Sequence, residues 1–159
     1  MKRVFIAGVP ATGKTTIGNY LKDRFNFVHF DVEDEESYPA NVLDFFSGLR
    51  TDTFLASIEE EDKNTVITWG FVCDDPQALK IINLLQKRGF KFVWFYAEKD
   101  LARKAFLERG TGSVANFDTQ MNRIKNLDLS AFDNPTTIVT LQKEGRKNKD
   151  EIVAEIMKL

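Results

Sequence analysis

Two kinds of apolar pattern alternate along the chain. Short, nearly continuous runs of apolar and β-branched residues have the length and composition of buried strands. They cover residues 2–7, 27–30, 65–69, 91–96 and 136–141. Between them, apolar residues recur every three or four positions, which is typical of helices that bury one face. These segments cover residues 14–25, 74–89, 98–108, 118–126 and 148–158, with a further helical region over 38–62 that breaks near 48–53.

This alternation predicts βαβ units, and therefore an α/β fold with a five-stranded parallel sheet. A chain of 159 residues has the size of one domain, and we assign residues 1–159 to a single unit. In such sheets, ligands bind beyond the carboxyl ends of the strands. Polar residues that directly follow a predicted strand are therefore candidates for a functional site. They lie at 12–16, 31–34 and 70–74, and at Glu98.

The junction between the first strand and the first helix carries the most specific signal. Residues 8–15 match G-x-x-x-x-G-K-[ST], the phosphate-binding loop. Successive N–H groups of such a loop form an anion site, and the N-terminus of the following helix adds the positive end of its dipole. Lys14 would neutralise the β- and γ-phosphates of a nucleotide, and the Thr15 hydroxyl would bind Mg²⁺. The residues that we expect to bind the phosphates are Gly8, Ala11, Thr12, Gly13, Lys14, Thr15 and Thr16.

The order of features along the chain resembles the small P-loop kinases of the shikimate kinase, gluconate kinase and nucleotide kinase group. The phosphate loop lies near the N-terminus, acidic residues end the second strand, the apolar third strand leads to Gly70, and a segment containing Arg109 comes late. The resemblance implies a three-layer α/β/α P-loop NTPase fold with strand order 2-3-1-4-5. It also implies transfer of a phosphoryl group from ATP, with Mg²⁺, to a small-molecule acceptor, under a lid that we place at about 109–117.

Carried over residue by residue, the resemblance assigns roles to the acidic residues that follow the second strand. Asp31 would hold a water bound to Mg²⁺, so that Thr15 and Asp31 form the metal site. Glu33 or Asp34 would face the acceptor hydroxyl, with Glu33 as the catalytic base. The group's usual second aspartate is replaced here by Glu33.

Three further residues are matched in the same way. Trp69 and Gly70 stand where the group has its glycine-rich acceptor loop, and Arg109 matches the lid arginine, with Arg103 as a second candidate. Trp69 is either part of the core or a stacking wall for a ring-shaped substrate. Arg109 is either a lid residue that neutralises the transferred group or a cation stabilised at a helix C-terminus. For His29 we expect a packed position in the core.

Composition and charge limit the classes of partner that we expect the protein to bind. The chain has 22 Lys and Arg against 24 Asp and Glu, a net charge of −2, which gives no electrostatic footprint for duplex nucleic acid or an anionic membrane. No apolar run approaches the roughly 18 residues of a transmembrane helix. The single cysteine, Cys73, cannot form an internal disulfide. We therefore expect a cytoplasmic protein, and the sequence leaves its oligomeric state open.

Two other functions stay open at this point. One is a nucleotide-binding module with little or no kinase activity, which signals through its conformation. The other is a P-loop kinase that acts on a larger acceptor, such as a nucleic-acid end or an antibiotic.

Overall fold

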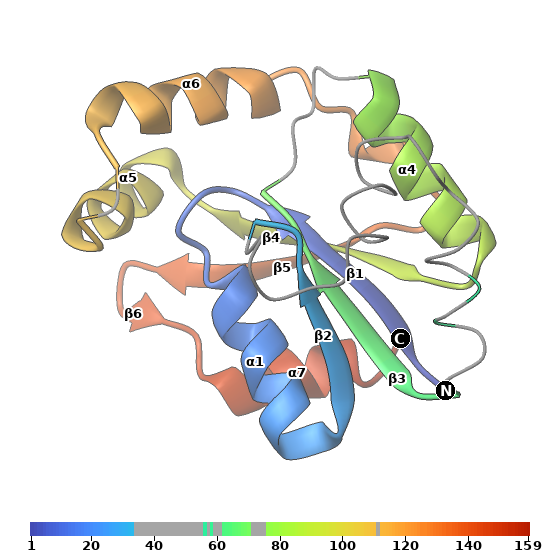
Figure 1. Ribbon diagram of the computed structural model, residues 1–159. Helices are drawn as coiled ribbons and strands as arrows, with labels where there is room; N and C mark the ends of the chain where they lie inside the picture. The colour runs from blue at the N-terminus through green and yellow to red at the C-terminus, as the bar shows by residue number, and fades with distance from the viewer. Residues whose placement is uncertain (34–55, 57, 59–61, 71–75, 111) are drawn as a thin grey trace.

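The computed structural model describes residues 1–33, 56, 58, 62–70, 76–110 and 112–159. Within them, six strands form one sheet in the order β2-β3-β1-β4-β5-β6 (Figure 1). β1 to β5 run parallel, and β6 is antiparallel to β5. The strands are Arg3–Gly8 (β1), Phe27–Asp31 (β2), Asn64–Thr68 (β3), Lys91–Ala97 (β4), Thr136–Gln142 (β5) and Gly145–Arg146 (β6).

The predicted α/β fold and the order 2-3-1-4-5 of the parallel strands are confirmed. The prediction of five strands misses β6. This strand has only two residues, Gly145 and Arg146, and both are exposed, so no apolar run marks it. It pairs with Leu141 and Gln142 at the end of β5 and forms a hairpin with that strand.

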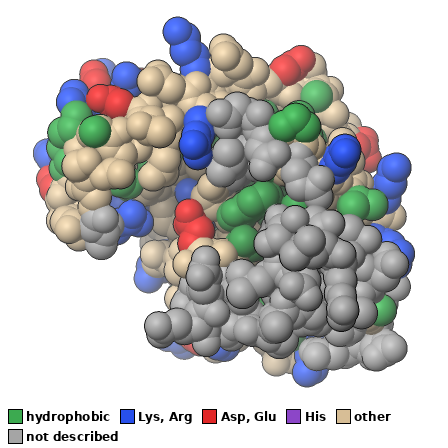
Figure 2. Space-filling model, turned by 45° about the horizontal axis from the view of Figure 1, so that its top comes forward, with side chains coloured by type: hydrophobic (Ala, Val, Ile, Leu, Met, Phe, Trp, Pro, Cys, Tyr) green, Lys and Arg blue, Asp and Glu red, His purple; other side chains and the backbone are tan. Residues whose placement is uncertain are grey.

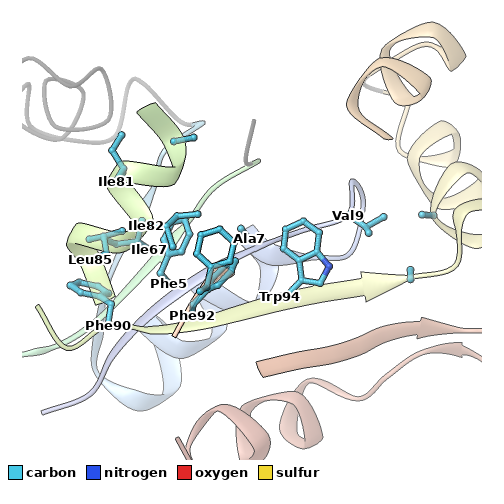
Figure 3. Close-up of a cluster of buried hydrophobic side chains, with 14 of the residues drawn as sticks. Phe5, Ala7, Val9, Ile67, Ile81, Ile82, Leu85, Phe90, Phe92 and Trp94 are labelled. Atoms are coloured by element: carbon cyan, nitrogen blue, oxygen red, sulfur yellow. The ribbon is translucent and has the colours of Figure 1, made fainter. Parts of the chain in front are cut away.

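Helices cover both faces of the sheet, as the three-layer prediction requires (Figure 1). Neighbouring residues of a strand point to opposite faces, so β1 contributes to two cores. Val4 and Ile6 pack against α1 and α7, whereas Phe5 and Ala7 pack against α4, α5 and α6. Figure 3 shows the second core, in which the aliphatic side chains of α4 lie over Phe5. The helices are Lys14–Phe25 (α1), Pro76–Lys87 (α4), Lys99–Glu108 (α5), Val114–Ile124 (α6) and Lys149–Ile156 (α7), and a 3-10 turn covers Leu129–Ala131.

One helix boundary was predicted wrongly. α6 begins at Val114, four residues before the predicted start at 118, and so overlaps the end of the segment 109–117 assigned to a lid. The Ser113 side chain accepts the N–H of Asn116, and the Asn116 side chain accepts the N–H of Ser113. This is a capping box with Asn in place of the usual Glu or Gln, and the sequence signature is therefore missing. Most of the helical region predicted over 38–62 lies outside the described residues.

The topology decides where a ligand fits. β1 is central, and it pairs with β3 on one side and β4 on the other. The order of connections reverses at β1, which makes its carboxyl end the topological switch point of the sheet. The phosphate loop begins there. Across the described residues, no helix combines the length and apolar character of a bilayer-spanning segment.

Candidate functional site

The phosphate loop has the backbone conformation of an anion site. Gly8 has a φ of 149°, and a Cβ there would overlap the backbone of Phe95 in β4, so only glycine fits. The N–H of Val9 donates to the same Phe95 carbonyl at 2.9 Å, which holds the loop to the sheet. Ala11 and Gly13 then take left-handed conformations with φ of 61° and 87°. These turns bend the chain sharply from β1 into α1.

The N-terminus of α1 is left open toward the loop. Gly13 is its N-cap, no side chain caps the helix, and its first turn holds no acidic residue. The first N–H groups and the positive end of the helix dipole are therefore available to an anion. Thr15 and Thr16 lie exposed in this first turn.

Lys14 folds back over the loop. Its Nζ donates to the carbonyls of Gly8 at 3.3 Å and Val9 at 3.2 Å, and the side chain is buried. Burial lowers the pKa of Lys14 from 10.5 to about 8. Glu33 and Asp31 act to raise this pKa, and Arg109 acts to lower it. These three charges therefore act on the ammonium, and a lysine whose pKa is perturbed in this way is a candidate for a functional site.

A cavity of about 300 Å³ opens over the loop. Among the described residues, five cationic side chains and one carboxylate, Glu33, line it, although the whole chain has a net charge of −2. Residues 11–16 form its floor, as the motif predicts. Four of the cations come from later parts of the chain: Arg109, Arg146, Lys147 and Lys149.

Asp31 and Glu33 meet the end of β3. Asp31 ends β2, is 8% exposed, and its Oδ1 accepts the N–H of Glu33 at 3.2 Å. The Glu33 carboxylate lies directly over the Cα of Gly70, where a Cβ would overlap it. The structure thus brings together Asp31, Glu33 and Gly70, and Asp34 lies outside the described residues.

A second cavity, of about 240 Å³, shares Glu33 with the first. Gln120, Arg123 and Ile124 of α6 line it, and their spacing places them on one face of that helix. Gly8, Pro10 and Gly70 are the other described residues that line it. The side chains of α6 were not predicted to belong to the site. Their spacing is the only signal in the sequence, and most surface helices show the same spacing.

The structure describes the positions of Trp69 and Arg109, for which the sequence left alternatives open. Trp69 packs edge-on against Phe5, with ring centroids 6.4 Å apart, and it lines neither cavity. Arg109 is the C-cap of α5, its Cζ lies 5.3 Å from the centre of the Phe106 ring, and it also lines the first cavity. Arg103 lines neither cavity.

His29 has the packed position that was expected. Its Nδ1 lies 2.9 Å from Oδ1 of Asn19, and its Nε2 lies 2.9 Å from Oγ1 of Thr68. The ring rests on Gly18 of α1, where a Cβ would overlap it. His29 therefore fixes α1 to β3.

Comparison with known proteins bears on the fold. No family model matches the chain. A protein of Methanocaldococcus jannaschii named "Putative adenylate kinase" is 30% identical over 112 residues, which cover 56% of this chain and 60% of that protein. The chain thus aligns with less than two thirds of that relative's length.

Several solved structures share the fold over nearly the whole chain. A gluconokinase from Sinorhizobium meliloti 1021 is 16% identical with a TM-score of 0.59, covering 99% of this chain and 90% of its own. A shikimate kinase from Acinetobacter baumannii in complex with shikimate is 14% identical with a TM-score of 0.59, covering 99% and 94%. A shikimate kinase from Bacteroides thetaiotaomicron is 16% identical with a TM-score of 0.60, covering 99% of each chain. The predicted likeness to the small P-loop kinases is confirmed at the level of the fold.

Proposed function

We propose, from the fold that this chain shares with the small P-loop kinases, that it transfers the γ-phosphoryl group of ATP, with Mg²⁺, to a small-molecule acceptor. The observation that carries the proposal is the pair of cavities that meet at Glu33. The first has the lining of a polyphosphate site. The second holds a carboxylate, a guanidinium and an amide, which suit a hydroxylated acceptor that carries a negative charge.

The first cavity supports the donor side of this proposal. The five cations and one carboxylate that the described residues supply would offset much of the charge of a triphosphate, which Lys14 and the N-terminus of α1 approach from below. Phosphoryl transfer asks a protein mainly for positioning and charge neutralisation. Arg109, on the wall of this cavity, would neutralise charge on the transferred group.

The residues present fit Mg²⁺. This ion keeps several waters and binds through one or two protein oxygens together with substrate phosphates. The Thr15 hydroxyl, exposed on α1, and the Asp31 carboxylate, at the end of β2, are oxygen donors of that kind. Among the described residues, no group of three or more His, Cys, Asp or Glu forms a site of its own. Bound Mg²⁺ would neutralise charge on the phosphates.

We place the acceptor in the second cavity. At about 240 Å³, this cavity lies near the lower end of the range of ligand pockets, about 300–1,000 Å³, which suits a small acceptor. Arg123 and Gln120 would bind an anionic group of the acceptor, and Glu33 would face its hydroxyl. As the acceptor oxygen bonds to the γ-phosphorus, its proton passes to the Glu33 carboxylate. The bond between the γ-phosphorus and the bridging oxygen breaks, and ADP leaves.

A panel of acceptors tests the proposal through ADP release from ATP and Mg²⁺. The panel contains hydroxylated carboxylates, nucleoside monophosphates, neutral polyols and an oligonucleotide with a free 5′ hydroxyl. We expect an anionic small molecule to raise ADP release above the basal rate. Arg123→Gln should then raise the KM for that acceptor by about tenfold or more, with a smaller effect on kcat. Lys125→Gln, an exposed lysine just after α6, is the matched control.

The other results separate the alternatives. Tight ATP binding with no acceptor that raises ADP release would favour a nucleotide-binding module. Activity on the oligonucleotide alone would favour a larger acceptor. Against this alternative, Figure 2 shows Lys and Arg side chains scattered among acidic and uncharged ones over the described surface in that view, with no continuous basic patch. Equal activity on neutral polyols, with an unchanged KM in Arg123→Gln, would refute the anionic acceptor. The cytoplasmic location of the protein stays a prediction from the sequence.

A further inference from the structure

The carbonyl groups of the phosphate loop are almost completely bonded. Between Gly8 and Gly13, five of the six carbonyl oxygens accept a hydrogen bond. Three of these bonded carbonyls are held from within the loop and α1, by Lys14, the Thr12 hydroxyl and the N–H of Ile17. The other two, those of Ala11 and Thr12, are held by the hairpin of β5 and β6.

The hairpin contacts join segments far apart in sequence. The Nη1 of Arg146 donates to the Ala11 carbonyl at 3.0 Å, across 135 positions. The Thr140 hydroxyl donates to the Thr12 carbonyl at 3.0 Å, across 128 positions, and Thr140 is only 2% exposed. The N–H of Lys147 donates to the Thr140 carbonyl at 3.0 Å, which fixes the two hairpin residues relative to each other.

These bonds determine where the neighbouring N–H groups point. A trans peptide is planar, and its C=O and N–H point in opposite directions. A donor that fixes the Ala11 carbonyl therefore turns the N–H of Thr12 the other way, and the bond from Thr140 does the same for the N–H of Gly13. Within the described chain, these two N–H groups meet no protein acceptor, and their residues line the first cavity. Ala11 needs such support, because a residue with a Cβ is strained at a φ of 61°.

We infer that Arg146 and Thr140 are positioning residues of the phosphate loop, which raise nucleotide affinity by aiming the N–H groups of Thr12 and Gly13 into the cavity. The inference rests on the proposed nucleotide site and concerns how that site is held. It does not depend on which acceptor the protein uses. Neither residue belongs to the loop motif, and β6 has no signal in the sequence.

Thr140→Val tests the neutral half of the pair. The change removes the hydroxyl at nearly constant shape and alters no charge, so a loss of affinity cannot come from a lost ionic attraction to phosphate. We expect the Kd for ADP, measured by calorimetry, to rise about fivefold, as for the loss of one hydrogen bond. Thr140→Ser keeps the hydroxyl and should recover most of that loss. Thr137→Val, at an exposed position of the same strand, is the control.

Arg146→Met tests the charged half, and here a direct contact with the nucleotide is the rival explanation. We expect a rise of about fivefold or more in the Kd for ADP, and little change in Lys143→Met, an exposed cation of the same hairpin. Adding Ala11→Gly to Arg146→Met separates the two explanations. Glycine adopts the left-handed conformation without strain, so it should restore part of the affinity if Arg146 acts through the loop.

The results have distinct meanings. If the wild type binds ADP and Thr140→Val has an unchanged Kd, or Ala11→Gly restores nothing in Arg146→Met, the inference is overturned while the nucleotide site stands. If the wild type binds neither ADP nor ATP, the proposed function itself fails. Should Thr140→Val not fold, the exposed Arg146 and the Ala11→Gly rescue still decide the matter.

Discussion

Replacing Lys14 with methionine should stabilise the ligand-free protein while it weakens nucleotide binding. The Lys14 side chain is 9% exposed, and burial lowers its pKa from 10.5 to about 8. Folding therefore places a charge where it is poorly solvated, which destabilises the ligand-free protein. A bound phosphate would stabilise the ammonium at this position. Lys14→Met keeps most of the unbranched apolar side chain and removes the ammonium.

The size of the effect follows from the pKa. The fall from 10.5 to about 8 corresponds to about 3 kcal/mol, at about 1.4 kcal/mol per pKa unit. Methionine gives up the hydrogen bonds to the Gly8 and Val9 carbonyls, which offsets about 1 kcal/mol. We therefore expect Lys14→Met to be about 2 kcal/mol more stable than the wild type at pH 7. The penalty of Lys14 is complete below pH 8 and disappears between about pH 8 and 10.5, so the advantage of the variant should shrink over that range.

Urea denaturation at several pH values measures this difference. The buffer must contain no phosphate, because an anion bound to the loop would stabilise the wild type. Lys22→Met, which removes an exposed lysine of the same helix, should change stability by less than about 0.5 kcal/mol. A Lys14→Met protein no more stable than the wild type at pH 7, or one whose advantage does not depend on pH, would refute the reasoning.

Three further predictions concern the same site. The affinity for ADP should be constant from about pH 7 to 8 and fall above pH 8, since Lys14 loses its proton there in the free protein. Calorimetry in buffers of different ionisation enthalpy should show that the protein takes up protons when ADP binds at pH 8.5. No proton uptake would contradict the assignment of this pKa to Lys14. Gly8→Ala should cost about 3 kcal/mol or more in urea, because its Cβ would overlap the backbone of Phe95. Gly89→Ala, with a φ of 83° and open space around it, should cost about 1 kcal/mol, and equal losses at the two glycines would be inconsistent with the packing. Asp31→Asn should lower turnover with the best acceptor by on the order of a hundredfold and change the Kd for ADP much less; an unchanged rate would remove Asp31 from the site.

The strands and the loop could be predicted because their signals are local. A buried parallel strand such as β3 is a continuous apolar run, and the glycines and Lys14 of the loop occupy fixed positions in a motif. The rule that ligands lie beyond strand ends selected Asp31, which ends β2 at this edge of the sheet, and its role in the site stays a prediction. The strands and the loop are features that depend on residues within a few positions of one another in the sequence.

The rest of the site depends on contacts between distant segments. Nothing near Arg146 in sequence shows that the hairpin brings it to Ala11, and nothing near Arg123 shows that α6 lies over the end of β3. Trp69 follows a strand and was left undecided between core and site, and its contact with Phe5 comes from the neighbouring strand. The depressed pKa of Lys14 could not be read from the motif, because burial is a property of the assembled fold.

The two hairpin bonds have a consequence for how the protein is made. Thr140 and Arg146, which hold the carbonyls of the motif, are translated more than 120 positions after it. A nascent chain that ends before β5 carries every residue of the motif and lacks the donors that aim it. If the loop binds ATP as proposed, capture on immobilised ATP should therefore retain chains that contain β5 and β6 and not chains that are truncated before β5.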